Sequence, residues 1–235
     1  MKRNEDLSLS ADISPSVFDS QYYSSGVYAR TYKEDVLSWV GKVARKVNCL
    51  LHDVSCPCVL DVGCAHGFLL AELQKKYGIE VHGLEYSRYA LQHAEKTVRG
   101  KIREGNILTA ELPSRAFDAV ICLDVFEYLT LKEVLRAAKH LVQWSNSFII
   151  FSTIYKNSRH ISQKTNPDPF RKSALTQVEY RNIFLRAGAK FIESFDADNG
   201  GSALVFKKVG KKQCYTKSIN DRINKNDKRK SGNAK

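Results

Sequence analysis

The sequence predicts an α/β fold, a doubly wound and mostly parallel sheet that ends in an antiparallel hairpin, and three observations predict it. A buried-strand pattern at residues 59–62 runs into a turn with glycines at positions 63 and 67 and then into an amphipathic helix. Strand and helix patterns then alternate as far as residue 187, which is typical of parallel strands joined by crossover helices. Two final strand patterns flank a glycine-rich turn near residue 200.

The expected elements carry recognisable start and stop signals. Ser87, Thr130 and Thr176 have side chains that cap helix N-termini, and Gly188 is the glycine expected after a helix C-terminus. We expect helices at residues 33–47, 68–77, 88–98, 130–144 and 176–187. We expect strands at residues 59–62, 79–85, 101–104, 116–124, 147–152, 190–197 and 202–208, the last two joined by the Asp-Asn-Gly-Gly turn of residues 198–201.

The turn after the first strand favours a cationic ligand over a pyrophosphate. A dinucleotide-binding fingerprint reads G-x-G-x-x-G, but this chain has Gly63, Ala65 and Phe68 in those positions. A phosphate cradle uses backbone N–H groups and the positive end of a helix, and Asp61 would place a negative charge beside it. S-adenosylmethionine fits this turn, because it carries a sulfonium and an ammonium on an adenosine and has no pyrophosphate.

Later strand ends supply further candidates for the same ligand. Glu85 ends the second strand, 18 residues after Gly67, at the spacing where an acid can hold the ribose hydroxyls. Asn106 and Ile107 follow the third strand, where an amide and an apolar side chain can contact the edge and the face of adenine. Asp124 ends the fourth strand, so the predicted pocket is acidic.

With these motifs in this order, the chain resembles the class I S-adenosylmethionine-dependent methyltransferases over residues 33–208, in particular bacterial small-molecule methyltransferases related to the ubiquinone-pathway O-methyltransferases. The resemblance implies a Rossmann-like, seven-stranded sheet whose closing hairpin most dinucleotide-binding folds lack. It implies that the loop after the first strand wraps the methionine part of the cofactor, that the second strand end holds the ribose and that the third holds the adenine. The implied cofactor-binding residues are Asp61, Gly63, Cys64, Ala65, Gly67, Glu85, Tyr86, Asn106, Ile107, Leu123 and Asp124.

Four positions depart from the pattern of the resembling family. Ala65 stands where glycine is commonest, His66 where a small hydroxyl residue is usual, and Asn106 where aspartate is usual. Tyr128 replaces the histidine of an E-x-x-E-H pattern, which weakens a metal-assisted or histidine-base mechanism. These departures leave open a non-catalytic scaffold that only binds S-adenosylmethionine.

An aromatic stretch precedes the first helix. In the related methyltransferases a segment before the first strand closes over the active site, and aromatic faces attract a sulfonium. We therefore expect Tyr22, Tyr23 or Tyr28 to line the pocket, with Tyr23 as the cofactor-binding candidate. The alternative is that these rings only pack the helix onto the sheet.

Methyl transfer is an in-line displacement, and a general base is needed only for a hydroxyl or a protonated amine. The candidates for this catalytic role are His160, in the loop of residues 153–173 on the ligand side of the sheet, Tyr128 and His66. We expect a small-molecule acceptor, methylated on oxygen or nitrogen.

Composition argues for a cytoplasmic enzyme without a metal. The first residues are polar, and no apolar run approaches membrane-spanning length. Two of the six cysteines, Cys64 and Cys122, lie in the cofactor loop and in a predicted buried strand, which is typical of core residues. Cys56 and Cys58 have one residue between them instead of two, and no matching pair or histidine cluster follows, so we expect no zinc.

The net charge of +12 is concentrated at the C-terminus. Residues 207–235 contain eleven Lys or Arg and two Asp, a balance of +9. We expect an N-terminal mobile lead and aromatic active-site cap (residues 1–32), a methyltransferase domain (residues 33–208) and a basic, disordered tail (residues 209–235). The basic segment can contact nucleic acid or an acidic surface, so an RNA or protein methyltransferase is an alternative, and a solubilising tail is the other reading.

Overall fold

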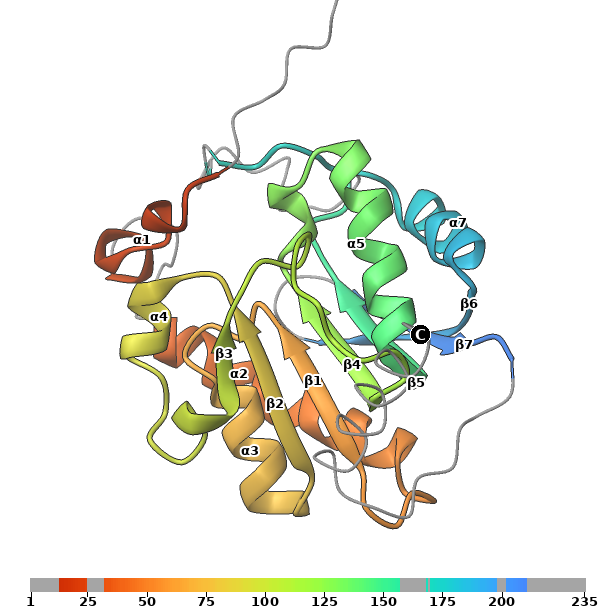
Figure 1. Cartoon of the computed structure of the whole chain (residues 1–235), viewed down its shortest axis with the longest axis horizontal. Coiled ribbons are helices and arrows are strands. Elements are labelled where there is room, and N and C mark those ends of the chain that lie inside the picture. Colours follow the sequence, from red (N-terminus) through yellow and green to blue (C-terminus); the bar gives the residue numbers. More distant parts are fainter. Residues whose placement is uncertain (1–12, 25–31, 157–167, 169, 198–201, 211–235) are drawn as a thin grey trace, which may run out of the picture.

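One seven-stranded sheet organises the protein (Figure 1). The structure is a computed structural model that describes residues 13–24, 32–156, 168, 170–197 and 202–210. The strand order is β3-β2-β1-β4-β5-β7-β6, with β1 to β5 parallel and β7 antiparallel to both of its neighbours. The strands are β1 (Cys58–Val62), β2 (Glu80–Glu85), β3 (Ile102–Glu104), β4 (Phe117–Leu123), β5 (Ser145–Ser152), β6 (Ala189–Asp196) and β7 (Ser202–Lys208). The predicted fold class is therefore confirmed.

Helices cover both faces of the sheet and enclose a hydrophobic core on each side (Figure 1). One face packs against α2 (Tyr32–Leu50) and α3 (Phe68–Tyr77), and the other packs against α5 (Leu131–Trp144) and α7 (Gln177–Ala187). The short helical segments are η1 (Pro15–Val17), α1 (Ser20–Ser24), α4 (Arg88–Gln92), η2 (Arg99–Lys101) and η3 (Phe126–Tyr128). No helix among the described residues is long and apolar enough to cross a membrane.

The predicted helix ends are confirmed at the capped positions. Thr130 and Thr176 each accept a hydrogen bond from the third residue of their helix, whose glutamate bonds back to the cap, so α5 and α7 both begin with a capping box. Gly188 ends α7 with a φ of 98°, a left-handed conformation that glycine adopts without steric cost.

The helix expected at residues 88–98 is shorter than predicted. It begins after Ser87, whose hydroxyl accepts a hydrogen bond from the N–H of Ala90, but α4 ends at Gln92. The N–H of Glu95 instead donates to the carbonyl of His66 at 2.9 Å. The chain leaves the helix because this segment packs against the turn after β1, where the buried Val98 side chain lies beside Gly67.

Candidate active site

A cavity of about 590 Å³ lies at the carboxyl ends of the parallel strands, the usual ligand-binding edge of a doubly wound sheet. It is lined by the ends of β1, β2 and β4, the segment after β3, helix α2 and the N-terminal segment. Of the twelve predicted cofactor-binding residues, eleven line it: Tyr23, Asp61, Gly63, Cys64, Ala65, Glu85, Tyr86, Asn106, Ile107, Leu123 and Asp124. The structure thus brings together residues that are up to a hundred positions apart in the chain.

Gly67 is the one that does not line the cavity. It is the N-cap of α3, with a φ of 74°, and a Cβ there would lie 2.9 Å from the Ile102 side chain. Gly67 therefore allows the turn to pack closely against β3.

The turn after β1 runs through left-handed backbone conformations. Gly63 has a φ of 74° and Ala65 a φ of 46°. A Cβ at Gly63 would collide with the Val125 side chain, so this position requires glycine for two reasons. Ala65 adopts the strained conformation with a side chain, which explains on physical grounds why glycine is commonest there.

Glu85 ties this turn to the end of β2. Its Oε2 accepts a hydrogen bond of 2.6 Å from the N–H of Ala65, and its Oε1 accepts one of 2.7 Å from the N–H of Ser87. Burial raises the pKa of Glu85, while these backbone hydrogen bonds lower it. The carboxylate therefore has a positioning role in addition to its predicted contact with a ribose.

Asp61 is a second buried carboxyl group on the cavity. Burial and the neighbouring charge of Glu85 raise its pKa from 3.8 to about 8. The same two acids help to raise the pKa of the Cys64 thiol, for which burial is the largest cause. A cationic ligand would relieve this destabilisation of the charged carboxylate, whereas a phosphate would add to it.

The other two strand ends complete the pocket. Asn106 follows β3, and its Oδ1 accepts a hydrogen bond of 2.8 Å from the N–H of Leu108, which fixes the turn that carries Ile107. Asp124 follows β4 with a φ of 54°, and the Ser152 hydroxyl donates to its Oδ1 at 3.1 Å. Neighbouring strand β5 therefore orients the carboxylate of Asp124.

The N-terminal segment contributes four residues to the cavity wall: Ile13, Phe18, Tyr22 and Tyr23. It is tied to the end of β2, because the Tyr86 hydroxyl donates to the Ile13 carbonyl at 3.0 Å and the Ser87 hydroxyl donates to the Phe18 carbonyl at 2.5 Å. Tyr23 is buried in a cluster with Ala65 and Ala90, and it also lines the cavity. It therefore combines a packing role with a place on the cavity wall. The third candidate, Tyr28, lies outside the described residues.

Tyr128 lies on the cavity wall at the centre of a hydrogen-bond chain. Its hydroxyl donates to Oδ2 of Asp168 at 2.7 Å and lies 2.7 Å from the Tyr22 hydroxyl. Since a phenol has one proton, Tyr22 is the donor in the second bond. Burial is the largest cause that raises the pKa of Tyr128, followed by Tyr22. No sequence pattern predicted that Asp168, forty residues after Tyr128, would contact it.

The neighbouring Glu127 has a structural role. It is buried, accepts a hydrogen bond of 2.6 Å from the Thr153 hydroxyl and does not line the cavity. Its backbone carbonyl accepts from the N–H groups of Lys172 and Ser173. Glu127 thereby holds the segment that follows Asp168 against η3.

His66, one of the two histidine candidates, is placed differently from Tyr128. His66 is half-buried among Tyr23, Tyr32 and Phe68 and does not line the cavity. Burial and the neighbouring His93 lower its pKa to about 4. His160 lies outside the described residues.

Several lining residues were not expected from the sequence. Helix α2 contributes Asp35, Val36, Ser38 and Trp39, helix α5 contributes Glu133, and the chain before α7 contributes Lys172. Helical periodicity identifies which side of α2 is apolar, but it does not show that one end of that side meets a ligand cavity.

Fold and site together define a class of protein. Residues 59–146 match the family model described as a methyltransferase domain. Residues 59–146 are therefore similar to a methyltransferase domain, which agrees with the predicted class I S-adenosylmethionine-dependent methyltransferase and with the predicted cofactor.

Two curated relatives illustrate the similarity. The chain is 33% identical over 109 residues to the ubiquinone biosynthesis O-methyltransferase of Chromobacterium violaceum, covering 43% of this chain and 46% of that protein. It is 26% identical over 190 residues to the phosphoethanolamine N-methyltransferase of Plasmodium falciparum, covering 77% of this chain and 70% of that protein. The match to the first relative thus spans less than half of its length.

Solved structures show the same fold. Magnesium protoporphyrin IX methyltransferase from Synechocystis PCC 6803 with bound SAH superposes with a TM-score of 0.62 at 17% identity, covering 82% of this chain and 96% of that chain. A SAM-bound amino pentose methyltransferase from Micromonospora echinaspora superposes with a TM-score of 0.61 at 18% identity, covering 79% of this chain and 99% of that chain.

Proposed function

We propose that this protein transfers a methyl group from S-adenosylmethionine to an oxygen or nitrogen of a small molecule. The observation that carries the proposal is the convergence of the predicted cofactor residues on one cavity that contains the buried carboxyl groups of Asp61 and Glu85. A cavity of about 590 Å³ is within the usual range for a small-molecule site. Its acidic character favours a ligand with positive charge.

The proposed cofactor contacts follow the strand ends. Each oxygen of Glu85 bonds one backbone N–H and keeps a lone pair that can accept from a ribose hydroxyl. Asn106 and Ile107 would hold the adenine, and residues 61–65 would surround the methionine part. When bound, S-adenosylmethionine supplies an electrophilic methyl group on a sulfonium.

The proposed acceptor side is the wall formed by Tyr22, Tyr128 and Lys172. Tyr128 can receive a proton from an acceptor hydroxyl or ammonium while its own proton moves to Asp168, 2.7 Å away. Tyr128 therefore needs no histidine beside it for this role. His160 stays the alternative predicted base.

One binding experiment and one methyl-transfer experiment test the proposal. Calorimetry with S-adenosylmethionine should show one site, and incubation of a metabolite extract with labelled cofactor should yield a labelled small molecule. Binding without any product would favour the non-catalytic scaffold. Absence of binding to folded protein would overturn the whole assignment.

The basic C-terminal segment supports the second candidate, methylation of RNA or protein. Residues 207–235 carry a balance of +9, and phosphate contacts by such a segment weaken steeply with salt. Deletion of residues 211–235 distinguishes the candidates, because unchanged turnover on a small acceptor would argue against a macromolecular substrate. Contact with nucleic acid and a cytoplasmic location stay predictions.

A further inference from the structure

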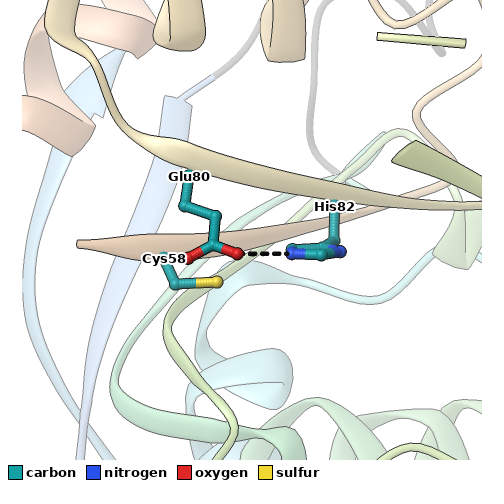
Figure 2. Close-up of side chains that lie close together, drawn as sticks. All are labelled: Cys58, Glu80 and His82. Atoms are coloured by element: carbon teal, nitrogen blue, oxygen red, sulfur yellow. Dashed lines mark hydrogen bonds and ion pairs between the residues drawn. The ribbon is translucent and has the colours of Figure 1, made fainter. Parts of the chain in front are cut away.

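Three side chains of kinds that can bind a metal, Cys58, Glu80 and His82, lie close together near the start of β1 and β2 (Figure 2). We propose that Cys58, Glu80 and His82 form a zinc site. Cys58 is the first residue of β1, and Glu80 is the first residue of β2. The parallel register pairs Cys58 with Glu80 and Leu60 with His82. Since side chains two residues apart lie on the same face of a strand, the three side chains share one face of the sheet.

The distances fit one tetrahedral ion after a small adjustment. The Nε2 atom of His82 lies 3.4 Å from Oε1 of Glu80, and the three ligand atoms lie within 4.8 Å of one another. Zinc bonds of usual length place nitrogen and oxygen ligands about 3.4 Å apart and sulfur about 3.6 Å from either. The Glu80 and His82 atoms already have this separation, and each distance to the sulfur would need to shorten by about 1.2 Å at most.

The donor set selects the kind of metal. A thiolate, an imidazole and a carboxylate are ligands that zinc accepts together, whereas magnesium and calcium require mainly oxygen ligands. The side chains of His82 and Glu80 are 29% and 36% exposed, so an ion and a water as fourth ligand can reach the site.

The surroundings hold the ligands in place. The N–H of Cys58 donates to Oδ2 of the buried Asp118 at 3.1 Å, and Asn146 donates to the other oxygen of that carboxylate at 3.3 Å. The His82 ring lies beside the Phe117 ring, with centroids 5.8 Å apart. Because the start of β4 and the start of β5 position the start of β1, a bound ion would join β1 to β2 at a prearranged place.

Cys56 and Cys58 have no second cysteine pair or histidine cluster near them in the sequence. Glu80 and His82 are more than twenty residues from Cys58, and strand pairing brings them together. The cluster lies near the amino ends of β1 and β2, whereas the cavity lies at their carboxyl ends. A bound ion would therefore connect the two strands and take no part in methyl transfer.

Metal titration of the full-length chain tests this inference. Protein stripped with a chelator is titrated with Zn²⁺ in competition with a chromophoric chelator, and with Co²⁺ to detect thiolate-to-cobalt charge-transfer absorption. We expect one zinc ion per chain, an affinity at least about tenfold weaker in His82→Ala and in Glu80→Gln, and no charge-transfer band in Cys58→Ser.

Cys56→Ser is the matched control, because it removes an exposed thiol two residues from the cluster and should leave binding and the cobalt band unchanged. The side chains of His82 and Glu80 are partly exposed, so their variants should keep the far-ultraviolet circular dichroism of the parent. The inference is overturned by absence of stoichiometric zinc binding, by binding that His82→Ala and Glu80→Gln leave unchanged, or by loss of binding only in Cys56→Ser. Affinity for S-adenosylmethionine should be the same with and without zinc, which separates this test from that of the proposed function.

Discussion

The Glu85 carboxylate accepts a 2.6 Å hydrogen bond from the backbone N–H of Ala65, twenty residues earlier in the chain. With its second bond, from Ser87, it connects the turn after β1 to the start of α4. One side chain thus shapes the loop and faces the cavity. Replacing it should therefore change both the affinity for the ligand and the stability of the loop.

Glu85→Ala should weaken S-adenosylmethionine binding about 10- to 100-fold, because a charged hydrogen-bond acceptor is lost. It should also lower the melting temperature, since the buried N–H groups of Ala65 and Ser87 lose their acceptor. Calorimetry and thermal unfolding measure the two effects. Glu104→Ala, at the exposed end of β3, is the control that should leave affinity unchanged. An unaltered Kd in Glu85→Ala would refute the ribose role.

Binding of S-adenosylmethionine should depend on pH through Asp61. The carboxyl group has a pKa of about 8 without ligand, and a bound cation should lower it. Affinity should therefore rise as the pH increases toward about 8 and level off above it, with protons released on binding at neutral pH. Calorimetry in two buffers of different ionisation enthalpy measures this release. Asp61→Asn should abolish it, and a pH-independent Kd in the parent would contradict the assignment.

The ligand-free protein should show the opposite trend in stability. Because the native-state pKa of Asp61 lies above the ordinary value of 3.8, the native state keeps a proton that the unfolded chain has lost. The free energy of unfolding should therefore decrease as the pH rises from about 4 to about 8. Denaturant titrations at several pH values should show a smaller decrease in Asp61→Asn than in the parent. A parallel pH profile in both proteins would argue against the raised pKa.

Substitutions of the two small residues in the turn after β1 should have different effects on stability and on cofactor binding. Gly63→Ala should destabilise the protein by about 2 kcal/mol or more and abolish cofactor binding, because the new methyl group collides with Val125 at a left-handed φ. Ala65→Gly should change stability by less than about 1 kcal/mol and keep binding, because it relieves backbone strain while adding chain entropy. Denaturant unfolding and calorimetry measure both. Equal effects of the two changes would contradict the geometry.

Tyr128→Phe should lower kcat on the order of 100-fold with little change in the Kd for S-adenosylmethionine, since it removes the hydroxyl that joins Tyr22 to Asp168. The measurement uses an acceptor found in the extract screen. Tyr155→Phe is the matched control, because its hydroxyl bonds the Ser202 carbonyl and does not line the cavity. A change in KM alone would show that Tyr128 only packs against the acceptor.

Local patterns were sufficient for most of the fold. Apolar runs predicted the strands, and the side chains of Thr130 and Thr176 predicted where two helices begin, because capping involves only residues within one turn. The end of α4 was missed because a long-range hydrogen bond from Glu95 to His66 replaces a helical one. No local pattern contains that bond.

The sequence by itself predicted the class of protein, since a strand, a glycine turn and the polar residues Glu85, Asn106 and Asp124 after the following strands are local features of one sheet edge. Only the tertiary structure showed which other side chains lie at that end of the sheet and which lie together at its opposite end. Asp168 bonds to Tyr128 although forty residues separate them in the sequence, and Glu80 and His82 approach Cys58 through the register of two parallel strands. Such contacts depend on how the whole sheet packs, and side chains that meet in this way need no recognisable spacing along the chain.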